Sequence, residues 1–182
     1  MKANSSKNIK AAITAVGGFV PKDFISNQDL EKILDTTDEW ITSRTGIKKR
    51  HILKGEGKGT SHLAIKAAED LIKKSNINPE KIDLVIVSTI TPDYKGPATA
   101  VTVASEINAK NAYAFDLSAA CSGFLYGMST ASSFIESGRY KKVLLIGADK
   151  MSSVVDYSRR ETSCLLYTSD AADEGLGVDL GG

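Results

Sequence analysis

The chain has 182 residues, of which 42% are hydrophobic and 25% are charged, with 23 Lys and Arg against 22 Asp and Glu. This composition is typical of a soluble chain that buries a core, and it excludes disordered and fibrous classes. The polar start has no apolar stretch behind it, so we expect a cytoplasmic protein without a membrane segment. No basic run is interleaved with aromatic residues, so we expect no nucleic-acid binding. The two cysteines lack paired spacing or His neighbours, so we expect neither a disulfide nor a metal site.

The predicted elements alternate between helix and strand along the chain. A flexible Gly-rich loop over 55–59 precedes an amphipathic helix over 61–75, and a buried strand follows over 81–88. A helix could begin at Pro97 and end near residue 107, because proline is tolerated in the first turn. Further elements are predicted as a strand over 112–116, a helix over 122–137 and a strand over 142–148. This order indicates an α/β fold with right-handed crossovers and a mainly parallel sheet.

The chemistry of the sequence concentrates at Cys121. The segment Phe-Asp-Leu-Ser-Ala-Ala-Cys-Ser-Gly-Phe ends a predicted strand, continues through a tight turn of small residues and places Cys121 where the next helix begins. At a helix N-terminus the macrodipole and free amides favour a thiolate, lower the pKa of the thiol and stabilise a thioester oxyanion. The alternative is a small buried hydrophobic residue, as cysteines among Ala and Ser often are.

Residues 164–182 differ in composition from the rest of the chain. They contain four acidic residues and no Lys or Arg, and they resemble the translation of a sequencing-library adapter in two segments in the correct order. A natural acidic, Gly-rich tail is the alternative. We expect residues 1–163 to form the native half-domain and 164–182 to be an unstructured, non-native tail. The remaining chain is then mildly basic, which suits an anionic small molecule or an acidic carrier protein.

Three motifs together resemble one family. They are Ala-Ala-Cys-Ser-Gly-Phe around Cys121, Asp-Thr-Thr-Asp-Glu-Trp-Ile over 35–41 and Arg-Thr-Gly-Ile-Lys-Lys-Arg over 44–50. In this order, and from about residue 9 to 162, the chain resembles β-ketoacyl-acyl-carrier-protein synthase III of the thiolase superfamily. The resemblance implies a thiolase-like fold, of which this chain is the N-terminal half of an αβαβα layered architecture with a mainly parallel mixed sheet.

The resemblance also implies an acyltransferase that initiates fatty-acid synthesis. An acyl group passes from acyl-CoA to Cys121, and malonyl-acyl-carrier protein then loses carbon dioxide and attacks the acyl-enzyme. The implied partners are acyl-CoA, malonyl-acyl-carrier protein and a second copy of the full-length chain. No cofactor is bound permanently, because CoA acts as substrate and leaving group.

Further site residues are carried over from the family. Trp40 and Arg44 would hold the CoA adenine, with Thr36 nearby and Arg160 across the entrance, since an indole and a guanidinium can sandwich a base. From the residues alone, Trp40 could equally be a core anchor and Arg44 a solvated charge. Gly96 stands where the family often has a bulky aromatic residue against the partner's acyl pocket. We therefore expect acceptance of longer or branched acyl groups, unless Gly96 only serves the turn before proline.

The family's catalytic His and Asn come from a second half that this sequence does not contain. His51 and His62 match neither position, and we read both as ordinary surface residues. We expect this chain itself to be catalytically incomplete, with exposed helix faces that lower its solubility. The alternatives are another CoA-dependent acyltransferase of the thiolase fold, making a polyketide-type product, and a noncatalytic half-domain.

Overall fold

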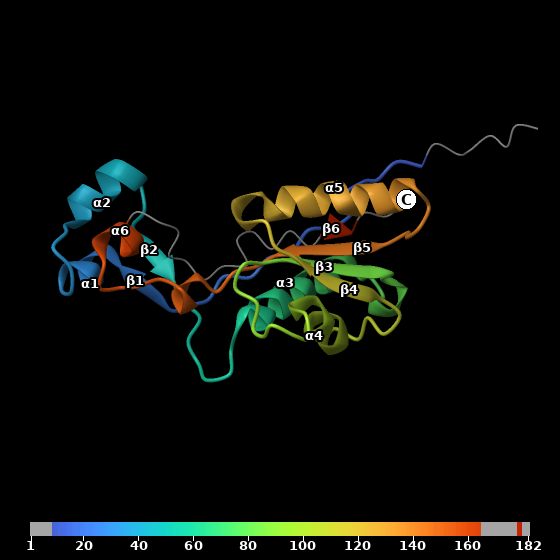
Figure 1. Cartoon of the computed structure of the whole chain (residues 1–182), viewed down its shortest axis with the longest axis horizontal. Coiled ribbons are helices and arrows are strands. Elements are labelled where there is room, and N and C mark those ends of the chain that lie inside the picture. The colour runs from blue at the N-terminus through green and yellow to red at the C-terminus, as the bar shows by residue number, and fades with distance from the viewer. Residues whose placement is uncertain (1–8, 165–177, 180–182) are drawn as a thin grey trace, which may run out of the picture.

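The computed structural model describes residues 9–164 and 178–179, which form a layered α/β unit and a smaller unit beside it (Figure 1). The first half of the described chain contains β1 (Phe24–Ser26), α1 (Asn27–Glu31), α2 (Asp38–Thr45), β2 (Lys49–His51), α3 (Thr60–Ser75), the 3-10 helix η1 (Pro79–Lys81) and β3 (Leu84–Ser88). The second half contains α4 (Thr99–Glu106), β4 (Tyr113–Leu117), the 3-10 helix η2 (Ala120–Ser122), α5 (Gly123–Glu136), β5 (Val143–Gly147), the 3-10 helix η3 (Met151–Ser153), α6 (Arg160–Ser163) and β6 (Val178–Asp179).

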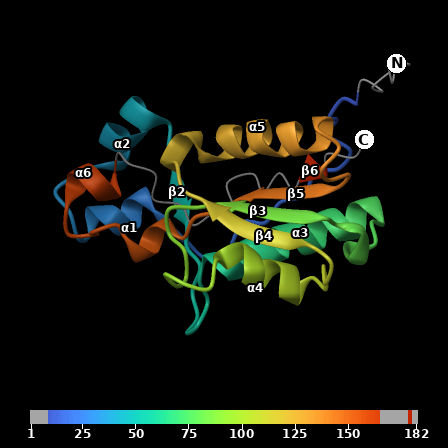
Figure 2. The ribbon, with the colours of Figure 1, turned by 45° about the vertical axis from the view of Figure 1, so that its right-hand side comes forward.

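The main sheet has the strand order β4-β3-β5-β6 and is covered by helices on both faces. The strand β3 is parallel to both β4 and β5, while β6 is antiparallel to β5. The helix α5 lies on one face, and α3 and α4 lie on the other (Figures 1 and 2). The α/β class and the mainly parallel mixed sheet predicted from the sequence are confirmed.

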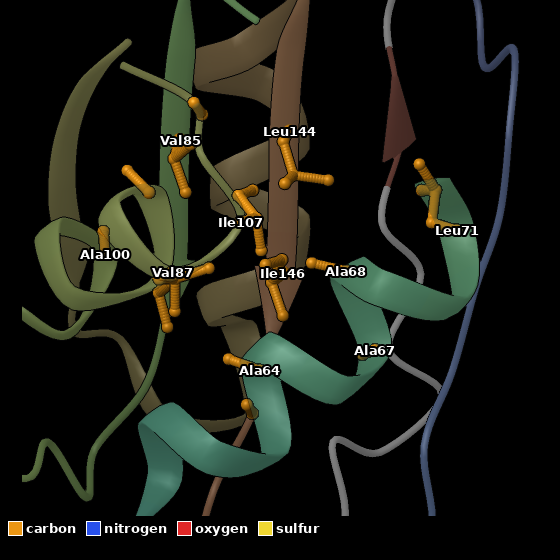
Figure 3. Packing of buried hydrophobic residues seen from close by; sticks show 14 of the residues in the cluster. Ala64, Ala67, Ala68, Leu71, Val85, Val87, Ala100, Ile107, Leu144 and Ile146 are labelled. Carbon is orange, nitrogen blue, oxygen red and sulfur yellow. The ribbon is translucent and has the colours of Figure 1, made fainter. Parts of the chain in front are cut away.

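Alternating side chains of β3 and β5 form two cores, one on each face of the sheet. One core packs against α3 and α4 and contains Val85, Val87, Leu144 and Ile146 (Figure 3). The small side chains of Ala64, Ala67 and Ala68 let α3 approach the sheet closely. The neighbours of these strand residues face α5 and form the second cluster with two of its side chains, Ala131 and Ile135. Both faces are apolar because strand residues alternate between two covered sides. The second cluster contains, from the strands, Leu84, Ile86, Val143 and Leu145.

Two predicted elements begin two or three residues later than their patterns indicated. The strand predicted from Lys81 begins at Leu84, because Pro79–Lys81 forms a 3-10 turn capped by the Asn78 side chain. The helix predicted from Pro97 begins at Thr99. Its first amides, those of Thr99 and Ala100, donate to the Asp116 carboxylate at 2.7 and 2.8 Å. A tertiary contact therefore sets this boundary.

The smaller unit consists of β1, β2, α1, α2 and α6, and it has a hydrophobic cluster of its own. The strands β1 and β2 pair antiparallel, and Leu30, Ile41 and Cys164 are fully buried between the helices. The sequence carries motifs here, but its pattern predicts no helix or strand. The reason is that the elements are too short for a periodic pattern, and their ends are set by caps.

The expected tail boundary falls at a packed residue. Cys164 is buried in the cluster of the smaller unit, and Val178–Asp179 pairs with β5 as β6. The rest of the predicted tail, residues 165–177 and 180–182, lies outside the described residues, so its non-native and unstructured character stays a prediction.

Large apolar side chains on α5 face away from the sheet. Leu125 is 67% exposed and Tyr126 is 58% exposed. An exposed apolar helix face of this kind favours association, in line with the expected low solubility, which stays a prediction. Over residues 9–164 and 178–179, no helix is both long and apolar enough for a membrane span.

Candidate active site

Cys121 lies in η2, the single 3-10 turn that leads directly from β4 into α5. The side chain of Cys121 is exposed, whereas Cys164 is buried. Ala120 has a φ of 46°, a left-handed conformation that is unfavourable for a residue with a Cβ. A strained residue directly before an exposed thiol is typical of a turn that presents a functional side chain. The expected position near a helix N-terminus is therefore found, one turn before α5.

The amides after Cys121 are already used within this turn. Ser122 N–H donates to Ala119 O at 3.1 Å, and Gly123 N–H donates to Ala120 O. The predicted donors to a thioester oxyanion therefore do not include these two amides in the present conformation. The field of α5 still favours negative charge at its N-terminus.

Close packing fixes the first turns of α5 on the sheet. Ser88, the last residue of β3, donates its hydroxyl to Gly123 O at 3.0 Å. A Cβ on Gly127 would lie 2.5 Å from Leu145 Cδ1 and 3.1 Å from Ser88 Oγ. Only glycine allows this approach, so Gly127 lets α5 lie close enough for Ser88 to hold the helix next to Cys121.

A polar network lies at the same carboxyl edge of the sheet, after β3 and β5. Asp149 Oδ1 accepts hydrogen bonds from Thr89 Oγ1 at 2.9 Å, from Ile90 N at 2.8 Å, and from Thr91 N and Oγ1 at 3.2 and 3.0 Å. Thr60 at the start of α3 donates its hydroxyl to Thr91 O at 2.5 Å. The network thus joins the loop after β3 to β5 and to α3.

Trp40 is presented by α2, a helix whose ends are both defined by its sequence. The Thr37 side chain caps the start by accepting from Trp40 N–H, and Gly46 ends the helix with a φ of 73°. The indole is half-buried and packs against the cluster of Leu30 and Ile41. Trp40 is therefore partly the core anchor that the sequence allowed, with part of its surface still accessible.

Two guanidinium groups lie over the Trp40 ring. The Arg44 Cζ atom is 4.5 Å from the ring centroid, and the Arg160 Cζ atom is 4.7 Å from it. Arg160 also donates to Asp35 O at 3.1 Å, and the Thr36 hydroxyl oxygen nearby in sequence is buried without a hydrogen-bond partner among the described residues. The structure thus brings Trp40, Arg44 and Arg160 together into one exposed cation–π cluster, which we call the Trp40 cluster.

The helices that carry the Trp40 cluster lie beyond the end of the sheet at which α5 begins (Figure 1). The helix α5 begins at the end of the sheet nearest the smaller unit, and α2 and α6 belong to that unit (Figures 1 and 2). Parallel strands place their carboxyl ends at one edge, which is where ligands bind in open α/β sheets. A ligand bound at this edge of the sheet would therefore lie next to the smaller unit.

Gly96 lies in the exposed loop before α4, and a Cβ at this position would meet nothing within 4 Å. No left-handed φ requires glycine here, since the glycines with positive φ are at other positions. A larger side chain therefore fits. The proposal that Gly96 widens the acyl preference stays open to test.

The two histidines are less exposed than expected from the sequence. The His51 Nδ1 atom lies 2.7 Å from Pro21 O, and His62 packs edge-on against Phe19 with ring centroids 6.3 Å apart. Both are half-buried, so the reading as ordinary surface residues is wrong. Within the described parts of the chain, no group of three or more His, Cys, Asp or Glu residues could hold a metal ion.

His62 makes the stability of the chain depend on pH. Burial, followed by the charges of Lys58 and Lys66, lowers the pKa of His62 below its ordinary value near 6.5. The unfolded chain therefore binds a proton more readily, and stability present above pH ~6.5 is lost as pH falls below it. We expect the free energy of unfolding, measured by urea denaturation, to fall less between pH 7.5 and 5.5 in His62→Gln than in the native chain. An equal loss in both would contradict this, and His51→Gln is the matched control.

Several residues that shape these sites were missed in the sequence. They are Ser88, Asp116 and Asp149 around the sheet edge, and Asn27 and Arg50 in the smaller unit. Asp116 stands in the Cys121 motif itself, so an acid inside an apolar strand was a usable signal. The others act through partners 11 or more positions away in the chain, which no local pattern reveals.

Comparison with known proteins gives consistent matches. The family model described as 3-oxoacyl-[acyl-carrier-protein] synthase III matches residues 115–173, a span that includes Cys121 and extends past Cys164. A β-ketoacyl-[acyl-carrier-protein] synthase III from Bacteroides thetaiotaomicron is 54% identical over 166 residues, which are 91% of this chain and 49% of that protein. The homologue from Chlorobaculum tepidum is 52% identical and covers 93% of this chain and 54% of its own.

Solved structures agree with the sequence matches. The 3-oxoacyl-[acyl-carrier-protein] synthase III of Aquifex aeolicus superposes with a TM-score of 0.87 at 44% identity, over 94% of this chain and 54% of that one. The priming β-ketosynthase of the R1128 polyketide pathway gives 0.89 at 32% identity, over 100% of this chain and 53% of that one. These neighbours confirm the predicted thiolase-like fold. The chain spans about half the length of the curated relatives it matches.

Proposed function

We propose that the chain belongs to the 3-oxoacyl-[acyl-carrier-protein] synthase III family and is the N-terminal part of an enzyme that initiates fatty-acid synthesis. The observation that carries the proposal is the exposed Cys121 on a strained turn directly before α5, inside the region that the family model matches. The enzyme would condense an acyl group from acyl-CoA with malonyl-acyl-carrier protein.

The proposed reaction has two steps at one sulfur. The Cys121 thiolate attacks the acyl-CoA carbonyl, a new C–S bond forms, and CoA leaves as its thiolate and takes up a proton. Malonyl-acyl-carrier protein then loses carbon dioxide, and the resulting carbanion attacks the acyl-enzyme and releases the Cys121 thiolate. The thiolate is suited to this role because it is both a good nucleophile and a good leaving group for thioesters.

We assign the adenine end of CoA to the Trp40 cluster. An indole stacks on a base, a guanidinium does the same from the other side, and arginines also bind phosphate. Arg44 and Arg160 already lie over Trp40, so a base that binds between two of these groups displaces one guanidinium from the ring. The buried hydroxyl of Thr36 lacks a hydrogen-bond partner in the described chain, and it reaches a bound ligand there only when its side chain turns outward.

The remaining parts of the machinery are proposed to lie in a second half. The chain has only two histidines, and both are held in other contacts, at Pro21 and at Phe19. The family's catalytic His and Asn, the homodimer and the acyl preference linked to Gly96 therefore belong to the longer protein. No permanently bound cofactor or metal is part of this proposal, and cytoplasmic localisation stays an expectation.

A second candidate is supported by one structural neighbour. The R1128 priming β-ketosynthase has a TM-score of 0.89, so a starter-unit enzyme for a polyketide-type product has the same fold. Its identity of 32% is lower than the 54% shared with the Bacteroides synthase, which favours fatty-acid initiation.

The test is acyl transfer to Cys121 from acetyl-CoA and from longer acyl-CoAs. Mass spectrometry is expected to find a thioester adduct on Cys121 in the native chain, slowly formed, with no β-ketoacyl product when malonyl-acyl-carrier protein is added. Cys164→Ser should keep the adduct and Cys121→Ser should lose it. An adduct that persists in Cys121→Ser, or none in the native chain and none in a polypeptide extended by the second half, would reject the proposal.

A further inference from the structure

Asn27 and Arg50 form a fully buried polar pair in the smaller unit, which also carries the Trp40 cluster. Their side chains are 0% and 1% exposed, and Arg50 Nη1 donates to Asn27 Oδ1. Asn27 is the first residue of α1, and Arg50 lies in the middle of β2. The pair therefore sits between the elements of the smaller unit, away from the sheet and from Cys121.

Asn27 ties α1 to α2, the helix that carries Trp40 and Arg44. Its amide nitrogen lies 2.6 Å from Asp38 Oδ1, 3.3 Å from Thr42 Oγ1 and 2.8 Å from Ile47 O. These partners are the first turn of α2, its middle and the residue after its C-cap. Because the contacts span the whole of α2, they fix both its position and its rotation about its axis.

Arg50 links the same pair to α6, the helix that begins with Arg160. Its Nη2 atom donates to Cys164 O at 3.3 Å, directly after the last residue of α6. The acceptor is a backbone carbonyl, so the bond depends on the path of the chain and not on the side chain at 164. Asn27 and Arg50 thus connect the helix of Trp40 to the helix of Arg160.

Burying this polar pair stabilises the fold less than apolar side chains of similar volume would. Burial lowers the pKa of Arg50, and its Nε atom is buried without a hydrogen-bond partner in the described chain. Buried ionic groups contribute little to stability compared with apolar residues of similar volume, and their attested role is to fix one arrangement among several. A guanidinium also reaches two partners in a fixed plane, which a lysine cannot do.

We propose that Asn27 and Arg50 are positioning residues that set the separation and orientation of Trp40 and Arg160, and so the geometry of the site for the adenine of CoA. The inference rests on the proposed function, because it takes the Trp40 cluster as the nucleotide site. Neither residue touches the ligand. Each acts through the helix that it holds.

The experiment compares CoA affinity across variants of the 182-residue chain by calorimetric titration with CoA. Arg50→Lys and Asn27→Leu are expected to raise the Kd for CoA about tenfold, while far-UV circular dichroism and the rate of Cys121 alkylation stay unchanged. Trp40 is the only tryptophan in the chain, so its emission and its quenching by acrylamide report the local geometry directly. Both should change in these variants. Lys49→Ala, on the same strand but at an exposed position, is the matched control and should leave the Kd within twofold.

Thr42→Val keeps the inference testable if the larger changes unfold the chain. It removes one 3.3 Å contact of Asn27 and should raise the Kd about threefold. The Trp40→Ala variant distinguishes a failure of the nucleotide site from a failure of the positioning role. If the native chain does not bind CoA, or Trp40→Ala binds it normally, the nucleotide site is wrong and the inference falls with it. If Trp40→Ala weakens binding while folded Arg50→Lys, Asn27→Leu and Thr42→Val bind normally, only the positioning role is overturned.

Discussion

In the folded chain, iodoacetamide is expected to alkylate Cys121 at least about 100-fold faster than Cys164. Cys121 is exposed on its turn before α5, whereas Cys164 is fully buried against Leu30 and Ile41. A reagent reaches a buried thiol only when the surrounding structure opens, and that opening is rare in a packed cluster. The two thiols therefore give two separate phases of reaction, which mass spectrometry of quenched samples resolves.

Two variants assign the phases to the thiols. Cys121→Ser should retain only the slow phase, and Cys164→Ser should retain only the fast one. In a denaturing concentration of urea both thiols should react at similar rates, because burial no longer separates them. Equal rates in the native chain would show that the end of α6 does not pack against α1 and α2, so that the helix of Arg160 would not be held in place by Cys164.

The Asp149→Ala variant is expected to lower the free energy of unfolding by about 3 kcal/mol. The Asp149 carboxylate accepts four hydrogen bonds from three residues of the loop after β3, and the alanine leaves those donors without their partner. Hydrogen bonds to a charged acceptor contribute about 1.5–3 kcal/mol each, reduced here because the site is only partly buried and water replaces some of them. Urea denaturation followed by circular dichroism measures the change.

The control for Asp149 is an acid without such a network. Glu69 forms an exposed ion pair with Lys66 at 2.6 Å, and surface pairs of this kind contribute little. Glu69→Ala should change stability by less than about 0.5 kcal/mol. If Asp149→Ala costs no more than this control, the loop after β3 is not held by the carboxylate.

The repeating pattern of the sheet unit could be predicted because it is local. Val85 and Val87 alternate with Leu84 and Ile86 along one strand, and β-branched runs of this kind indicate a strand covered on both faces. The smaller unit could not be predicted in the same way. Its strands are three residues long. Its elements are joined by the hydrogen bonds of Asn27, a polar residue that local patterns assign to a surface or a turn.

The candidate site residues show the same contrast between local patterns and long-range contacts. Cys121 was found from its own motif, and Trp40, Arg44 and Arg160 were found from the resemblance to a family. Their arrangement was not, because Arg160 is 120 positions from Trp40 and only the fold places its guanidinium 4.7 Å from the indole.

By itself the sequence predicted the α/β class, Cys121 as the candidate nucleophile and the resemblance to a family, since each rests on motifs whose residues are close together in the chain. The tertiary structure decided where α4 begins, how α5 is seated beside Cys121 and what holds the Trp40 cluster together. Those features depend on Asp116, Ser88, Gly127, Asn27 and Arg50 meeting partners from other elements. A hydrogen bond or a close contact across elements has no periodic signature, so only the folded chain shows it.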